Sequence, residues 1–211
     1  MTIAALSGYN QTSIIEDIIG IEGGDTETDN PDDHGGDTRF GVTLKEATSF
    51  LSQLKAQFNW DGTMAHFTEP MAMWVYVNGY WNVLNLTSIF AVHPLIAHKL
   101  FDIGVNMGVG EAGQFLQRVL NVLNKGQAWY PDLAVDGGIG SKTVNALTTY
   151  IQKRGSAPMG VWHVLFGLSA LQGAFYITDA EHDSSQETFE DGWLERAADI
   201  FGHDAHLLGK M

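Results

Sequence analysis

The stretch of residues 22–43 carries the side chains best suited to acid-catalysed hydrolysis. Glu22 precedes two glycines, and Asp33 and Thr38 follow on a Gly-rich, acidic segment. Cleavage of a glycosidic bond needs one carboxyl group that holds a proton for the leaving oxygen, and a second acidic or polar group across the cleft. The residue types in this stretch therefore indicate glycosidase chemistry, with Glu22 as the general acid.

An apolar helix must position Glu22. Ser13 and Glu16 have the spacing of a capping box at a helix start, and isoleucines follow at helical intervals. Glu22 lies four residues after Ile18 and three after Ile19, so it shares their apolar face. Partial desolvation there would raise the pKa of the carboxyl group, as a general acid requires. The alternative is a solvated glutamate at a helix end.

Asp33 and Thr38 are candidates for the second half of the site. The Asp33 carboxylate could stabilise an oxocarbenium-like transition state or orient the attacking water, and the Thr38 hydroxyl could hold that water. The alternative is turn chemistry, because Asp and Thr side chains often cap turns beside glycines. Inverting and retaining routes differ in carboxyl separation, so both stay open at this point.

Two further pairs could contact a sugar. Tyr80 and Trp81 could stack on a sugar face, or pack in the core at helical spacing with their apolar neighbours. Asp102 and Asn106 are four residues apart on one expected helix, so they could pair locally or line the cleft. We treat all four as candidate substrate-binding residues.

The pattern around these residues predicts an α+β fold that is predominantly α-helical. A short strand or hairpin is expected within residues 30–43, mainly at 38–43. Helices are expected over residues 14–22, 44–58, 69–81, 94–104, 110–123, 141–154, 161–177 and 191–200. The segment 126–140 is rich in Gly, Asp and Pro and suggests a boundary between a region 13–125 and a region 126–205, packed as one compact unit.

Composition excludes several classes of function. The chain has 211 residues, no cysteine and a formal net charge of −14, which argues against thiolate chemistry and against nucleic-acid binding through phosphates. Residues 159–178 lack Asp, Glu, Lys and Arg and approach membrane-spanning length, but their polar residues favour a buried core helix over membrane contact. The first residues lack the features of a signal peptide.

No metal or cofactor is expected. His93 and His98, and likewise His203 and His206, do not form a His-Glu-x-x-His zinc motif. The acidic segment 25–37 does not follow the register of an EF-hand loop, so we expect a solvated acidic loop rather than a calcium site.

Four blocks in order resemble the glycoside hydrolase family 108 lysozymes. They are Glu22-Gly23-Gly24, Asn30-Pro31-Asp32-Asp33, Gly35-Gly36-Asp37-Thr38 and Phe40-Gly41-Val42-Thr43. Later blocks are similar to the same family: Tyr80-Trp81, Phe101-Asp102 with Val105-Asn106, Val135-Asp136-Gly137, and Gly192-Trp193 with Arg196. Members are N-acetylmuramidases, found mainly as phage endolysins and related secretion-activity proteins.

The resemblance implies a lysozyme-like fold that cuts the β-1,4 bond between N-acetylmuramic acid and N-acetylglucosamine. It implies catalytic roles for Glu22, Asp33 and Thr38, and a peptidoglycan-binding region at 126–205. His34 stands where a proline is common and the acidic turn is longer, so Asp32 stays an alternative to Asp33. A non-catalytic wall-binding module and a chitinase- or chitosanase-like glycosidase are the other readings.

The same resemblance gives expectations about partners and location. Peptidoglycan is the expected partner, with no nucleic acid and no membrane span, and the chain is expected to be a monomer. Without a signal peptide, such an endolysin would be made in the host cytoplasm and reach the periplasmic wall through holin-type release or another export route.

Overall fold

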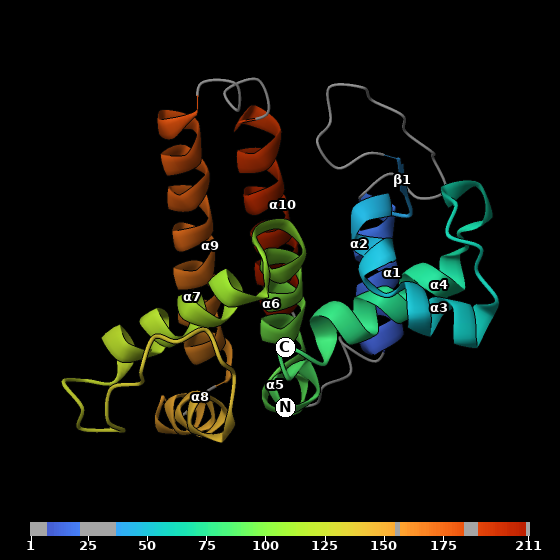
Figure 1. Ribbon diagram of the computed structural model, residues 1–211. Helices are drawn as coiled ribbons and strands as arrows, with labels where there is room; N and C mark the ends of the chain where they lie inside the picture. The colour runs from blue at the N-terminus through green and yellow to red at the C-terminus, as the bar shows by residue number, and fades with distance from the viewer. Residues whose placement is uncertain (1–7, 22–36, 155–156, 184–189, 210–211) are drawn as a thin grey trace. The chain divides into compact units, whose positions relative to one another are not determined.

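The computed structural model describes residues 8–21, 37–154, 157–183 and 190–209 (Figure 1). The chain forms two compact units. We call residues 9–83 the hairpin unit, and residues 84–211 together with 1–8 the helical unit. Glu22, Asp32 and Asp33 lie outside the described residues, as does most of the acidic segment.

The hairpin unit holds short helices and the one sheet of the described chain. Its elements are α1 (Gln11–Ile21), β1 (Thr38–Arg39), β2 (Val42–Thr43), α2 (Leu44–Ser49), α3 (Leu51–Phe58), the 3-10 helix η2 (Met64–His66), α4 (Glu69–Tyr76) and the π-helical turn η3 (Val77–Trp81). The single helix expected over 44–58 is wrong, because Phe50 leaves helical geometry (φ −107, ψ 17) and divides it into α2 and α3.

Helix α1 leads directly to the position of Glu22. The cap expected at Ser13 is wrong: Asn10 precedes the helix and Ser13 is its third residue. Asn10 Oδ1 accepts a hydrogen bond from the Ser13 backbone N–H, and Ser13 Oγ accepts one from the Asn10 backbone N–H, each at 3.0 Å. This reciprocal pair is a capping box three residues earlier than expected. The predicted isoleucine face is buried, with Ile14, Ile15 and Ile18 fully inaccessible.

The helical unit is built from six helices in its described residues. They are α5 (Leu86–Val92), α6 (Pro94–Met107), α7 (Val109–Leu123), α8 (Ser141–Lys153), α9 (Ala157–His182) and α10 (Glu190–Gly209). Helix α9 packs against α6, α7, α8 and α10, and it lies beside α10 along its length (Figure 1). The buried side chains Phe101, Leu116 and Leu165 bring α6, α7 and α9 into one core.

Helix α9 is the apolar segment noted in the sequence. Its stretch Pro158–His182 is, among the described residues, the one helix whose length and composition would allow it to cross a membrane. Val161, Val164, Leu165 and Leu168 are fully buried, and polar Gln172 is buried with them. One face of α9 therefore packs in the core as expected, while Met159, Trp162, Phe166 and Ile177 are exposed on it and only 39% of the apolar window is buried.

The predominantly helical α+β class is confirmed, since one two-stranded antiparallel sheet accompanies the helices of the described chain. The compact units divide between Val83 and Leu84. The boundary near residue 126 falls inside the helical unit, and a division of function there stays a prediction.

Candidate functional site

Thr38 lies on a tight β-hairpin. Phe40 and Gly41 form its two-residue turn, both with positive φ (52 and 73), which is the pattern of a type I′ turn. Thr38 pairs with Thr43, and Arg39 pairs with Val42. Because side chains alternate along a strand, Thr38 and Thr43 lie on the face opposite fully buried Val42. The Thr38 hydroxyl is therefore on the half-exposed face of the hairpin.

Two contacts fix this hairpin. The Tyr76 hydroxyl on α4 donates to the carbonyl oxygen of Phe40 at 3.1 Å. Arg39 Nη1 donates to the carbonyl oxygen of Ala65 on η2 at 3.0 Å. A left-handed backbone is unusual for a bulky residue such as Phe40, so the surrounding structure must hold it there. The unit thus keeps the Thr38 strand in one position.

A carboxyl group with an altered pKa follows the hairpin. The Thr43 hydroxyl caps α2 by accepting from the Glu46 backbone N–H at 3.2 Å. Burial raises the pKa of the Glu46 carboxyl group, and a hydrogen bond with Tyr80 partly offsets that shift. The sequence interpretation missed Glu46. The one feature of the sequence that could have indicated Glu46 is its position three residues after Thr43, in the first turn of a helix. Many exposed glutamates occupy such positions, so this feature is not specific.

Tyr80 and Trp81 differ in exposure. Both lie in η3, whose π-helical turn is closed by the hydrogen bond from the Asn82 backbone N–H to the Val77 carbonyl oxygen at 2.9 Å. Such turns occur often at functional sites. Trp81 is only 2% exposed, which fits the core-packing alternative, whereas Tyr80 is half-buried beside Glu46.

Asp102 is a buried hub in the helical unit. Its carboxylate is fully inaccessible and accepts hydrogen bonds from Arg196 Nε at 2.9 Å and Gln172 Nε2 at 3.0 Å. Lys99 Nζ lies 3.6 Å from Asp102 Oδ2, and Asn106 Nδ2 donates to Asp102 Oδ1 at 3.1 Å. Asp102 and Asn106 therefore pair locally, and a role of either residue in substrate binding stays a prediction.

Comparison with known families decides the class of the protein. Residues 15–108 match glycosyl hydrolase 108. This match identifies a glycosyl hydrolase 108 region in the chain. Residues 111–198 match the predicted peptidoglycan domain, so the two matches together cover most of the chain and the predicted family is confirmed. The glycosyl hydrolase 108 region contains Thr38, Glu46, Tyr80 and Asp102.

A solved structure has the same fold. Brucella abortus SagA is 21% identical to this chain, with a TM-score of 0.66 over 94% of this chain and 95% of SagA. None of the curated proteins matches the sequence. The family matches support a glycoside hydrolase that acts on peptidoglycan.

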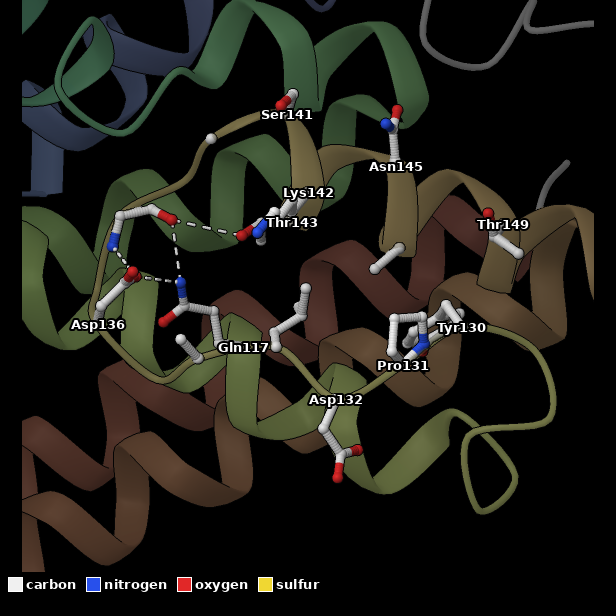
Figure 2. A pocket seen from close by; sticks show the side chains of 15 residues that line it. Gln117, Tyr130, Pro131, Asp132, Asp136, Ser141, Lys142, Thr143, Asn145 and Thr149 are labelled. Carbon is white, nitrogen blue, oxygen red and sulfur yellow. Dashed lines mark hydrogen bonds between the residues drawn. The ribbon is translucent and has the colours of Figure 1, made fainter.

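The peptidoglycan domain holds a cavity of about 630 Å³. Helix α8 forms one wall and the loop of residues 130–140 forms the other (Figure 2). Lys142, Asn145 and Thr149 line the helical wall and share one helix face, at spacings of three and four residues. The cavity therefore combines an ordered polar wall with a loop wall.

Amide side chains on α7 hold this loop. Gln117 Nε2 donates to Asp136 Oδ1 at 2.7 Å and to the Gly138 carbonyl oxygen at 2.9 Å (Figure 2). One turn later, Asn121 makes two hydrogen bonds to the backbone of Leu133, at 2.7 and 2.9 Å. Each buried bond replaces one to water and restricts the loop backbone.

Helix α7 also approaches the loop closely where Gly113 of the helix lies against Gly137 of the loop. A Cβ atom on Gly113 would lie 1.8 Å from the Gly137 carbonyl oxygen, which no real contact allows. Gly137 itself has a φ of +79, a conformation that favours glycine. The cavity wall is thus preformed by close backbone packing as well as by amide hydrogen bonds.

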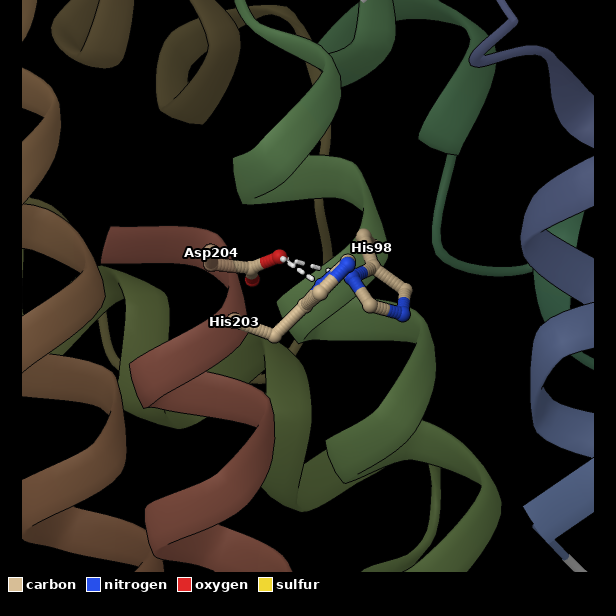
Figure 3. Close-up of side chains that lie close together, drawn as sticks. All are labelled: His98, His203 and Asp204. Carbon is tan, nitrogen blue, oxygen red and sulfur yellow. Dashed lines mark hydrogen bonds and ion pairs between the residues drawn. The ribbon is translucent and has the colours of Figure 1, made fainter. Parts of the chain in front are cut away.

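A histidine–aspartate cluster lies between α6 and α10. His98, His203 and Asp204 each offer a ligand atom, all within 4.8 Å of one another (Figure 3). The sequence interpretation missed this group, because it joins residues more than 100 positions apart. His98 Nδ1 lies 2.9 Å from Asp204 Oδ1, and His203 Nδ1 lies 3.6 Å from the same oxygen.

The chemistry of this cluster is that of a buried carboxylate held by two imidazoles. Burial, the largest single influence, would raise the pKa of Asp204, but the hydrogen bonds and charge interactions with His203 and His98 together hold that pKa below its usual range. A divalent cation bound through His98 Nδ1 and Asp204 Oδ1 would replace the hydrogen bond between these two atoms. The arrangement therefore fits a buried hydrogen bond that joins α6 to α10.

Proposed function

We propose that the protein is a muramidase, which hydrolyses the β-1,4 bond between N-acetylmuramic acid and N-acetylglucosamine in peptidoglycan. The observation that carries this proposal is the family match over residues 15–108, joined to a predicted peptidoglycan domain. A glycosidase joined to a peptidoglycan domain is expected to act on peptidoglycan. The glycan strands of peptidoglycan contain the β-1,4 bond between N-acetylmuramic acid and N-acetylglucosamine.

Glu22 is the proposed general acid. Helix α1 ends at Ile21 and buries the isoleucine face that Glu22 would continue. A carboxyl group beside apolar side chains keeps its proton to higher pH. That proton would pass to the glycosidic oxygen as its bond to the sugar C1 breaks, so that the leaving group departs as a neutral hydroxyl.

Asp33, with Asp32 as the alternative, and Thr38 are proposed to complete the reaction. The second carboxylate would stabilise positive charge at C1 or accept a proton from the attacking water. The anchored hairpin supports a positioning role for the Thr38 hydroxyl, because the strand that carries it is fixed by Tyr76 and Arg39.

The test compares wild type with Glu22→Gln and Thr38→Val on purified peptidoglycan sacculi. Glu16→Gln is the matched control, since Glu16 is exposed on the same helix. Loss of a general acid should lower the rate by about 100- to 10,000-fold, and the control should stay near wild type. Thr38→Val should lower the rate without lowering the unfolding midpoint.

The products decide between substrates. Mass spectrometry of wild-type digests should show fragments that end in reducing N-acetylmuramic acid. If the wild type cleaved chitin or chitosan and left sacculi intact, the protein would be a different glycosidase and not a muramidase. Full activity of Glu22→Gln would show that Glu22 is not the general acid. If the wild type bound sacculi but did not cleave them, the protein would be a non-catalytic wall-binding module.

A further inference from the structure

The cavity between α8 and the loop of residues 130–140 belongs to the helical unit, whereas the proposed catalytic residues belong by sequence to the hairpin unit. We propose that this cavity is a second glycan-binding site, which holds an N-acetylated amino sugar of the peptidoglycan strand. The proposal rests on the proposed action on peptidoglycan, and it requires no catalytic step.

The polar wall suits an uncharged sugar. Asn145 and Thr149 offer an amide and a hydroxyl group, which can donate to and accept from sugar hydroxyl and acetamido groups. Both lie on the face of α8 that also carries Lys142, and Ala146 between them leaves room at the wall. Neutral groups that bond in both directions are the partners that a neutral, hydroxyl-rich ligand needs.

The opposite wall supplies apolar surface. Its lining includes Tyr130, Pro131, Leu133 and Ala134, and the Tyr130 hydroxyl donates to the Leu120 carbonyl oxygen at 2.8 Å. A pyranose ring and an acetamido methyl group both present C–H surface that packs on such side chains. The cavity therefore offers apolar contacts for the ring from the loop wall, beside the carboxylates of Asp132 and Asp136, and neutral hydrogen-bonding groups from α8.

Charge argues against the stem peptide as the occupant. Asp132, Asp136 and Lys142 line the cavity, which gives it one more negative than positive group. The pKa of Asp136 is lowered, first by the hydrogen bond from Gln117 and then by that from the Gly138 backbone N–H, so this carboxylate stays ionised. A peptide stem carries more carboxylates than ammonium groups and would be repelled, whereas the glycan is neutral at these positions.

The loop is ordered before any ligand arrives. Gln117 and Asn121 on α7 hold its backbone, and Asn124 Nδ2 donates to Asp132 Oδ1 at 2.6 Å. These amides stand four and three residues apart, so they form a row along one helix face. A preformed site spends little free energy on ordering when it binds, which favours recognition of a ligand as small as one or two sugars.

The experiment uses the full chain carrying Glu22→Gln, so that no ligand is consumed. Chitotetraose is the glycan probe, and the stem tetrapeptide L-Ala-γ-D-Glu-meso-diaminopimelate-D-Ala is the competing probe. Backbone NMR shifts then report which residues respond. We expect chitotetraose to shift the amides of residues 130–149, and the tetrapeptide to leave them unchanged.

Variants separate this site from the catalytic one. Asn145→Leu combined with Thr149→Val should weaken the response of residues 130–149 by about tenfold or more, since each lost hydrogen bond contributes about 1 kcal/mol. Gln152→Leu is the matched control, because Gln152 is exposed on the same helix but does not line the cavity. Unchanged unfolding midpoints show that the variants are folded.

Three outcomes would overturn the proposal. They are no shift in residues 130–149 with chitotetraose, an equal shift in the double variant, or a response to the tetrapeptide in place of the glycan. Failure of the catalytic proposal looks different. In that case the wild type would leave sacculi uncut while the glycan still shifted residues 130–149.

Discussion

Asp102 on α6 accepts a hydrogen bond at 2.9 Å from Nε of Arg196 on α10, which lies 94 residues later. Asp102 falls in the glycosyl hydrolase 108 region and Arg196 in the peptidoglycan domain. The ion pair therefore joins the two matched regions inside one compact unit. Helices α5 and α6 belong by sequence to the first region and by packing to the core of the second.

Replacing Asp102 by Ala should lower the free energy of unfolding by about 3–5 kcal/mol. The change leaves Arg196 and fully buried Lys99 without their anionic partner. Urea denaturation measures the loss. Asp179→Asn on the exposed face of α9 is the control and should change stability by less than about 0.5 kcal/mol. Equal stability of both variants would contradict a hub role for Asp102.

Replacing Gly113 by Ala should lower stability by about 1–3 kcal/mol or more, because the new methyl group would overlap the Gly137 carbonyl oxygen. Gly110→Ala is the matched control on the same helix, since a Cβ there meets nothing within 4 Å. Alanine favours helix at that position by up to about 1 kcal/mol. Thermal unfolding should therefore move in opposite directions for the two variants, and a stable Gly113→Ala protein would refute the close approach.

His93 should make the protein less stable in mild acid. Burial lowers the pKa of His93 to about 4, and the nearby Asp204 charge offsets only part of this shift. The unfolded chain, with an ordinary pKa of about 6.5, then binds more protons, so stability is lost as pH falls from about 6.5 towards 4. Between pH 7 and pH 5 this one residue should cost about 1–2 kcal/mol.

The control for this pH dependence is His93→Asn. His93 Nδ1 accepts a hydrogen bond from the Leu95 backbone N–H at 3.3 Å and so caps α6. Asparagine can cap the helix in the same way but does not titrate. Urea midpoints at the two pH values should differ less for His93→Asn than for wild type. An equal pH dependence of the urea midpoint in wild type and His93→Asn would show that folding does not lower the pKa of His93.

The pH dependence of stability from Glu46 should run in the opposite direction to that from His93. Its folded pKa is raised, first by burial, so the stability linked to its proton is full below the ordinary value and is lost as pH rises through the folded pKa. Glu46→Gln keeps an acceptor for Tyr80 and removes this loss. We expect Glu46→Gln to gain stability relative to wild type as pH rises from 4 to 7, whereas exposed Glu16→Gln should show no such trend.

Local patterns predicted much of the fold, since helix periodicity and the Gly-rich turn depend on neighbouring residues. The isoleucine face of α1 and the short β element were both visible in this way. The break at Phe50 was not, because aromatic residues are common inside helices. The shift of the α1 cap to Asn10 shows the usual uncertainty of helix ends.

The candidate site was less predictable where contacts span the sequence. The sequence predicted a short strand or hairpin that carries Thr38, and the structure contains the hairpin. The pairing of Glu46 with Tyr80, and of His98 with Asp204, depends on how helices pack, which spacing does not encode. Asp102 was noticed for its polarity beside Asn106, but its burial follows from Arg196 and Gln172, which lie far along the chain.

The shared core of the helical unit sets a limit on engineering this enzyme. An exchange of the peptidoglycan domain at the boundary between the two family matches would join chains at residues 109–110. A cut there would separate α6 from α7, α9 and α10 and expose apolar surface on both pieces. A junction between Val83 and Leu84 would instead keep that core intact, so exchange of specificity should be attempted at that point.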